Sequence, residues 1–171
     1  VVFSGENNVA EIGSYAFSGC GELTGFSFGE NLTEIKEHTF ESCTKLSGEL
    51  RLPKNLTVIG AYAFSSCSAL NGNLNIPENV TSIGEGAFSG CSGLTGNLQL
   101  PEKITSIGTY AFNGCSGFNG SLTLPSEITE IADSVFGNCS GFMGELTIPA
   151  GVTRIGRYAF GSCSGFSGTL K

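Results

Sequence analysis

Apolar and polar residues alternate in short segments that recur along the chain. Residues 73–76 read Asn-Leu-Asn-Ile, residues 97–100 read Asn-Leu-Gln-Leu, and residues 121–124 read Ser-Leu-Thr-Leu. A period of two is typical of a β-strand with one buried face. A proline follows each segment, and because proline cannot donate to a strand ladder it marks the strand end. The pattern therefore predicts a short strand and a turn in each unit.

A second apolar cluster follows each proline. In residues 80–83, Val-Thr-Ser-Ile, the two apolar residues stand three apart, which favours a short extended piece that enters a turn. Gly84 comes next and permits that turn. The Ala-Phe-x-x-Cys of residues 87–91 has a spacing that suits one helical or 3₁₀ turn with its apolar residues pointing inward. Because so few residues cannot form a stable helix alone, we expect short turns rather than full helices.

The whole pattern recurs with a fixed period. Phe-x-x-Cys occurs seven times, and successive cysteines lie 23, 24, 24, 24, 24 and 24 residues apart. Such a period indicates one structural unit stacked on copies of itself, a solenoid in which each unit buries its apolar face against its neighbours. One column just before the alternating segment is always glycine, which indicates positive φ or no room for a Cβ. Its members are Gly25, Gly48, Gly72, Gly96, Gly120, Gly144 and Gly168.

The columns Ile-Gly-x-x-Ala-Phe-x-x-Cys, followed by Leu and then by Leu-x-Leu/Ile-Pro, resemble the BspA-like leucine-rich repeats, also called the Treponema type, over residues 6–170. The resemblance implies a leucine-rich-repeat solenoid, a right-handed superhelix of the α/β type, rich in β-structure. It would have a parallel sheet, short 3₁₀ or helical turns and about seven repeats of 24 residues. It also implies an extracellular or cell-surface location and a role in adhesion, as in several relatives. Most units here carry one residue more than the family unit, beside the glycine column, which is expected to alter the curvature.

Composition limits the classes of partner. With 40% apolar residues and no long apolar run, we expect no membrane insertion and a single leucine-rich-repeat array over residues 1–171. Because the chain starts without Met and ends in mid-unit, we expect it to be a fragment of a longer protein. The net charge is −7, from 15 acidic and 8 basic residues, and the basic residues are not clustered. This argues against nucleic acid or an anionic membrane surface as a partner.

The seven cysteines form one column. Neighbouring coils of a parallel sheet lie about 4.8 Å apart, within the Cα separation that a disulfide tolerates. Parallel, deep side chains and an odd count nevertheless favour buried free thiols that fill space as small apolar groups. Disulfides and a redox role are the alternatives. A metal site would need Cys or His at short spacings, which the sequence lacks, so neither metal nor cofactor is expected.

Catalysis is not expected. The chain has one histidine, His38, and it lacks a glycine-rich phosphate loop, His-Glu-x-x-His and Gly-x-Ser-x-Gly. Carboxylates such as Glu34, Glu130 and Glu145 are scattered over different columns, so no acid–base pair can be assigned.

The first candidate binding surface is the column that precedes Ala-Phe, called here the tyrosine column. It carries all four tyrosines and the histidine. Tyrosine combines apolar area with a hydroxyl, so a row of rings could stack against sugar rings or anchor a protein partner. The alternative is that the rings merely cover the turn and the edge of the core. The candidates are Tyr15, His38, Tyr62, Tyr110 and Tyr158.

The second candidate is the outward side of the alternating segments, called here the strand face. Amides and hydroxyls spaced one coil apart could hydrogen-bond a polysaccharide or an extended peptide. The alternative is a solvated face in which Asn side chains bond along the stack. Glu49 beside Arg51 interrupts the neutral run, and Glu145 with Thr147 continues the column. The candidates are Asn73, Asn75, Asn97, Gln99, Ser121 and Thr123.

The sequence favours a non-enzymatic recognition or adhesion module of a cell-surface leucine-rich-repeat protein, which binds a protein or glycan. A structural spacer or stalk without a specific ligand is one alternative, although the exposed columns vary more than a spacer requires. Homotypic assembly through uncapped ends is another, because open sheet and apolar surface could meet a second copy.

Overall fold

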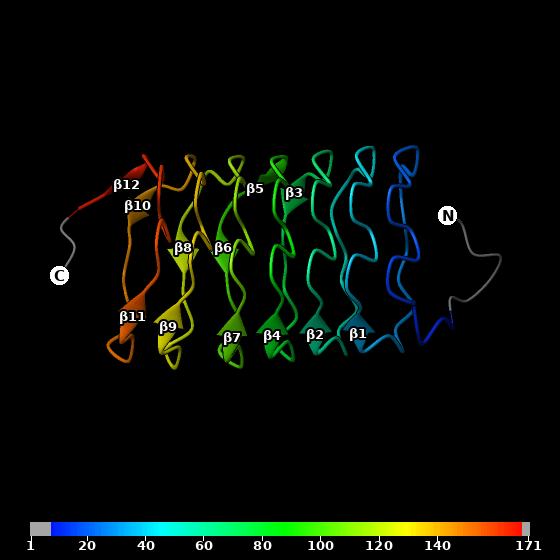
Figure 1. Cartoon of the computed structure of the whole chain (residues 1–171), viewed down its shortest axis with the longest axis horizontal. Helices are drawn as coiled ribbons and strands as arrows, with labels where there is room; N and C mark the ends of the chain where they lie inside the picture. The colour runs from blue at the N-terminus through cyan, green and yellow to red at the C-terminus, as the bar shows by residue number, and fades with distance from the viewer. Residues whose placement is uncertain (1–7, 169–171) are drawn as a thin grey trace.

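A computed structural model describes residues 8–168, which form a stack of similar coils arranged side by side along the longest axis (Figure 1). The described residues contain no helix, and their regular structure consists of short parallel strands joined by turns. The predicted leucine-rich-repeat solenoid is therefore confirmed, whereas its assignment to the α/β type was wrong. The expectation of one array over residues 1–171 stays a prediction, since residues 1–7 and 169–171 lie outside the described part.

Twelve strands of two residues each occur within residues 8–168. They are β1 (Glu34–Ile35), β2 (Val58–Ile59), β3 (Gly72–Asn73), β4 (Ser82–Ile83), β5 (Leu94–Thr95), β6 (Leu98–Gln99), β7 (Ser106–Ile107), β8 (Leu122–Thr123), β9 (Glu130–Ile131), β10 (Gly144–Glu145), β11 (Arg154–Ile155) and β12 (Phe166–Ser167).

The largest sheet forms from the second apolar cluster of each unit. Strands β1, β2, β4 and β7 pair in parallel, β9 pairs with β11, and all six lie along one edge of the solenoid (Figure 1). The alternating segments, from which the sequence predicted the main strands, contain only the pair β6 with β8. The pairs β3 with β5 and β10 with β12 form at the glycine column and just before it. The residues were placed correctly in extended structure, but the cluster after each proline forms the longer ladder.

The glycine after this ladder keeps neighbouring coils in contact. A Cβ built on Gly84 would lie 2.4 Å from the backbone nitrogen of Ala61 in the preceding coil, and one on Gly108 would lie 2.3 Å from that of Glu85. Neither glycine has positive φ. The position therefore requires glycine for close packing of coils rather than for the turn that the sequence predicted.

The ladder is interrupted where another residue takes this position. Ala132 replaces the glycine between β7 and β9, which are not paired, and Lys36 replaces it after β1, where the sheet starts. The Gly108 N–H donates to the Ile83 carbonyl at 2.8 Å, whereas within residues 8–168 no such bond joins Ala132 to Ile107. The methyl group of Ala132 thus coincides with a local break in the ladder, while the same two coils stay bonded elsewhere, as from Phe112 to Val135 at 2.9 Å.

Overlapping β-turns, and no 3₁₀ helix, carry the Ala-Phe-x-x-Cys segment across the described coils. N–H groups alternate between two acceptors: Ala63 donates within its coil to Gly60 at 3.3 Å, and Tyr62 donates to Glu85 of the next coil at 2.7 Å. Tyr62 and Ser66 have φ of 54° and 61°, which a 3₁₀ helix does not allow. The expected helical or 3₁₀ turn was therefore wrong, because every second N–H bonds across coils.

Positive φ also explains most of the glycine column before the alternating segments. Five of its members have φ between 79° and 93°: Gly48, Gly72, Gly96, Gly144 and Gly168. Gly120 does not, but a Cβ there would lie 2.1 Å from the Asn97 side-chain oxygen, so it lacks room instead. The prediction of positive φ or no room is confirmed for these six, while Gly25 shows neither constraint.

The core is a continuous stack of aromatic rings. From Phe17 to Phe160, the phenylalanines of Phe-x-x-Cys stack on one another with neighbouring centroids 5.2–5.6 Å apart. Beside them the cysteines are free thiols, as expected. Each thiol from Cys43 to Cys163 donates to the carbonyl of the preceding coil's phenylalanine at 2.9–3.1 Å, so the cysteines also hydrogen-bond along the stack.

Candidate functional site

The six predicted residues of the strand face are all exposed, and the leucines between them, such as Leu98, are buried. The predicted alternation of burial is therefore confirmed. Each of the six also lines one of two open depressions on this face. Asn73, Asn75, Asn97 and Gln99 line the first depression, and Ser121 and Thr123 line the second.

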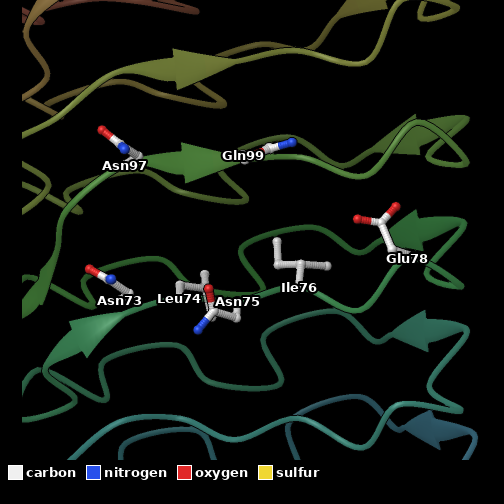
Figure 2. A pocket seen from close by; sticks show the side chains of 7 residues that line it. All are labelled: Asn73, Leu74, Asn75, Ile76, Glu78, Asn97 and Gln99. Atoms are coloured by element: carbon white, nitrogen blue, oxygen red, sulfur yellow. The ribbon is translucent and has the colours of Figure 1, made fainter.

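The first depression has a volume of about 370 Å³ and is mostly polar. Asn73 and Asn97 project in the same direction from neighbouring coils, and Glu78 stands at the opposite end (Figure 2). Leu74 and Ile76 lie between them and are nearly buried, so they form its floor. The amides around the rim can donate and accept hydrogen bonds, and the Glu78 carboxylate accepts them.

The Asn97 side chain already makes hydrogen bonds to the next coil. Its Oδ1 accepts the backbone N–H of Ser121 at 2.9 Å and the Ser121 hydroxyl at 3.3 Å. Asn75 makes only a long contact of 3.5 Å with Glu49. Within the described chain, the side chain of Gln99 makes no hydrogen bond to protein, which leaves this amide available to a ligand. The alternative of Asn side chains bonded along the stack therefore holds at Asn97.

Both depressions lie where the strand ladder is open. Between β6 and β8 the Leu100 N–H donates to the Thr123 carbonyl at 3.1 Å. In the structure of residues 8–168 the equivalent bonds are absent at Leu124, one coil later, and at Ile76, one coil earlier. Within residues 8–168, the N–H groups of Ile76 and Leu124 therefore make no such bond between coils at the depressions.

The register of the strands explains the open ladder at the first depression. β3 and β5 place Gly72 opposite Leu94, while β4 and β7 place Ser82 opposite Ser106. The coil from Leu94 to Ser106 therefore has two more residues between these levels than its neighbour. The two segments therefore cannot stay in one register throughout, and the extra residues interrupt the pairing, as in a β-bulge.

The second depression is larger, about 700 Å³, and has a mixed lining. Its polar residues include Glu127, Glu145 and Thr147, and its apolar part includes Leu124 and Pro149. Glu145 and Thr147 continue the column of the candidates and could have been included from the repeat alone. Glu127 lies after Pro125, outside the alternating segments. The sequence therefore did not indicate that it lines the same depression.

Some rings of the tyrosine column stack on one another within the chain. Tyr15 stacks on His38 with ring centroids 4.5 Å apart and an interplanar angle of 7°, and His38 stacks on Tyr62 at 5.0 Å. The Tyr62 ring in turn covers Gly86, whose Cβ would lie 2.4 Å from Cε1 of that ring. These rings turn their faces toward one another, which supports the covering role at this end of the column.

The hydrogen bond of the Tyr62 hydroxyl also supports the covering role. The Tyr62 hydroxyl donates to the Glu85 carboxylate, and this hydrogen bond, with burial, raises the pKa of Tyr62 to about 12. His38 Nδ1 lies 2.8 Å from Glu41 Oε2. Tyr15, Tyr110 and Tyr158 are nevertheless exposed, at 54%, 45% and 73%. A role of the tyrosine column in binding stays a prediction.

The buried thiols are expected to be unreactive. Burial raises the pKa of Cys67 and of Cys139 to about 12, and it raises the pKa of Cys91 and Cys115 well above the ordinary thiol value. Thiolates are the reactive form, so these groups are poor nucleophiles at neutral pH. Among residues 8–168, no three His, Cys, Asp or Glu side chains are grouped to hold a metal ion. The described residues also lack a helix that is long and apolar enough to span a membrane.

Comparison with known proteins agrees with the solenoid fold. The model of the BspA type leucine rich repeat region matches six copies, over residues 2–96 and 94–168. No match is found among curated proteins. A crystal structure of a T. pallidum leucine-rich repeat protein is 31% identical, with a TM-score of 0.83, over 93% of this chain and 72% of that one.

Two further crystal structures, each 28% identical, share the fold. A leucine-rich repeat protein from Bacteroides ovatus has a TM-score of 0.68 over 88% of this chain, and a leucine-rich cell surface protein from Faecalibacterium prausnitzii has one of 0.60 over 86%. This chain spans only 44% and 33% of their lengths. The match over most of the repeats shows that the chain belongs to the BspA-type leucine-rich repeat family.

Proposed function

We propose that the chain is a non-enzymatic recognition module of a cell-surface leucine-rich-repeat protein and that it binds a protein or glycan through the strand face. The observation that carries this proposal is that both depressions lie on that face and take in all six predicted residues. The description of the Faecalibacterium prausnitzii relative as a cell surface protein supports an extracellular or cell-surface location.

The placement of the side chains supports binding rather than acid–base chemistry. His38, the single histidine, stacks in the tyrosine column and contacts Glu41, and neither residue lines the depressions. The depressions present amides, hydroxyls and carboxylates spaced one coil apart, which suits repeated hydrogen bonds to an extended ligand. Such a surface needs neither a cofactor nor a metal, and its acidic character disfavours nucleic acid.

Homotypic assembly is a second candidate, because open sheet and apolar surface of a stacked array could meet a second copy. Ile155 in β11 is 50% exposed, although isoleucines of that column are buried in the middle coils, as at Ile83. A second copy could cover this surface. Sedimentation over rising protein concentration tests this, because a chain that stays monomeric throughout excludes it.

The proposal is tested by screening the purified chain on arrays of glycans and extracellular-matrix proteins. We expect saturable binding to at least one class, retained after the tyrosine column is altered. No saturable binding to any member would contradict the recognition proposal and favour the structural spacer.

A further inference from the structure

We propose that the second depression binds an extended segment of a partner protein that carries a Lys or Arg side chain between small apolar residues. This inference rests on the proposed function and gives one part of the strand face a ligand chemistry. The depression is defined by Ser121–Leu124, Ser126, Glu127, Glu145, Thr147 and Pro149–Gly151.

Charge is the first argument. Glu127 and Glu145 both line the depression, and no Lys or Arg lines it. Elsewhere in residues 8–168, most Lys and Arg side chains pair with other carboxylates, and Lys103 donates to Asn79. The Lys and Arg ion pairs are Lys36–Glu11, Lys45–Glu22, Arg51–Glu49, Lys54–Glu30 and Arg154 with Glu130 and Asp133.

Hydrogen-bond chemistry is the second argument. An ionised carboxylate only accepts hydrogen bonds, and a Lys or Arg head group only donates them. Glu127 receives only a long 3.4 Å bond from the Ser126 hydroxyl, and Glu145 accepts no hydrogen bond within the described chain. By contrast, Glu102 just outside the lining accepts both the N–H and the hydroxyl of Ser126, at 2.8 and 2.9 Å. The hollow therefore holds two carboxylates that accept little or no hydrogen bonding from the described chain.

The apolar part and the open ladder favour a peptide over a sugar. Leu122, Leu124 and Pro149 give the hollow an apolar side against which an aliphatic stem or a small side chain can pack. The Leu124 N–H makes no bond to the next coil, so it can donate to a peptide carbonyl, as edge strands do. The first depression is lined mainly by polar groups, whereas the second has a mixed lining.

The test is an NMR titration of the uniformly ¹⁵N-labelled chain with two acetylated and amidated hexapeptide pools. Both pools contain Val, Leu, Ser and Thr at random, with Lys fixed at two positions in one pool and Glu at the same positions in the other. We expect the Lys pool to shift amides of Ser121–Leu124, Glu127 and Glu145, and the Glu pool to shift none of them. Cellohexaose serves as the neutral glycan probe.

The variant Glu127→Gln/Glu145→Gln should raise the dissociation constant of the Lys pool about 2- to 30-fold, the range expected for two exposed ion pairs. A control with the same charge change, Glu34→Gln/Glu37→Gln, lies outside both depressions and should leave it unchanged. Raising the salt concentration from about 0.02 to about 0.3 M should weaken binding of the Lys pool to the wild-type chain.

The inference is overturned if the Lys pool shifts no amide of the depression, if both variants bind it equally, or if cellohexaose gives the same shifts. Concentration-dependent shifts without any probe would assign the hollow to a second copy instead, and would also overturn it. These outcomes differ from failure of the proposed function. If the array screen still finds a ligand, the strand face keeps its role while the basic-peptide assignment falls.

Discussion

Replacement of Gly84 by alanine should separate two coils of the solenoid in the way that Ala132 separates β7 from β9. The new methyl group would lie 2.4 Å from the Ala61 nitrogen and 2.6 Å from the Gly60 carbonyl carbon. Both contacts are to backbone, which cannot move aside as a flexible side chain can. The coils must therefore part at the junction of β2 and β4.

The cost follows from the bonds at this junction. The Gly84 N–H donates to the Ile59 carbonyl at 2.8 Å, and the Thr81 N–H donates to the Thr57 carbonyl at 2.9 Å. Loss of two such bonds costs about 1–3 kcal/mol. Alanine restricts the unfolded chain and returns about 0.4–1 kcal/mol. We expect the free energy of unfolding to fall by about 1–2 kcal/mol.

Chemical denaturation combined with amide hydrogen exchange measures both parts of this effect. Gly13→Ala is the matched control, because Gly13 holds the same column in the first described coil and a Cβ there has nothing within 4 Å. It should be neutral or slightly stabilising. If Gly84→Ala leaves stability unchanged and the Thr81 and Gly84 amides stay protected, the close-packing role of this glycine is refuted.

Three further outcomes are expected. Phe88→Ala should lower the free energy of unfolding by about 3–5 kcal/mol in chemical denaturation, because Phe88 is fully buried between two stacked rings. Phe160→Ala, near the end of the stack, should lower it less. Equal losses in the two variants would contradict the energetics of a stacked array. Ellman's reagent should detect seven thiols in denaturant, while Cys91 should not react in the native chain; fewer than six would disprove free thiols. Because burial raises the pKa of Cys67 to about 12, the unfolded chain releases that proton first as the pH rises above about 9. Stability should therefore fall between about pH 9 and 12, less steeply in Cys67→Ala, and an identical slope in both proteins would contradict this.

The repeat pattern predicted the solenoid, the buried columns and the exposed strand face, because burial alternates at positions such as Leu98 and Gln99 in every coil. Spacing alone could not predict the turns. Tyr62 and Ser66 adopt positive φ, which few non-glycine residues do, so the segment that resembles a helical turn instead bonds across coils. That arrangement depends on neighbours 24 residues away, which local spacing does not report.

The candidate site was predicted in part for the same reason. The strand face follows from one column, but the hollows depend on where the ladder opens, and that depends on pairing register between coils. Glu127 reaches the second depression only because the chain returns after Pro125. The repeat also gave no hint that Ala132, a conservative change from glycine, would interrupt a sheet and leave a crevice of about 340 Å³.

The most direct test of the strand-face proposal is surface plasmon resonance with the ligand found on the arrays, using two variants. Gln99→Ala/Thr123→Val alters two register partners of β6 and β8 whose side chains make no hydrogen bond within the described chain. Tyr15→Ser/Tyr158→Ser alters exposed rings of the tyrosine column. We expect the first variant to lose most of the affinity and the second to retain it. Full affinity in the first variant and loss in the second would contradict the strand face as the recognition surface.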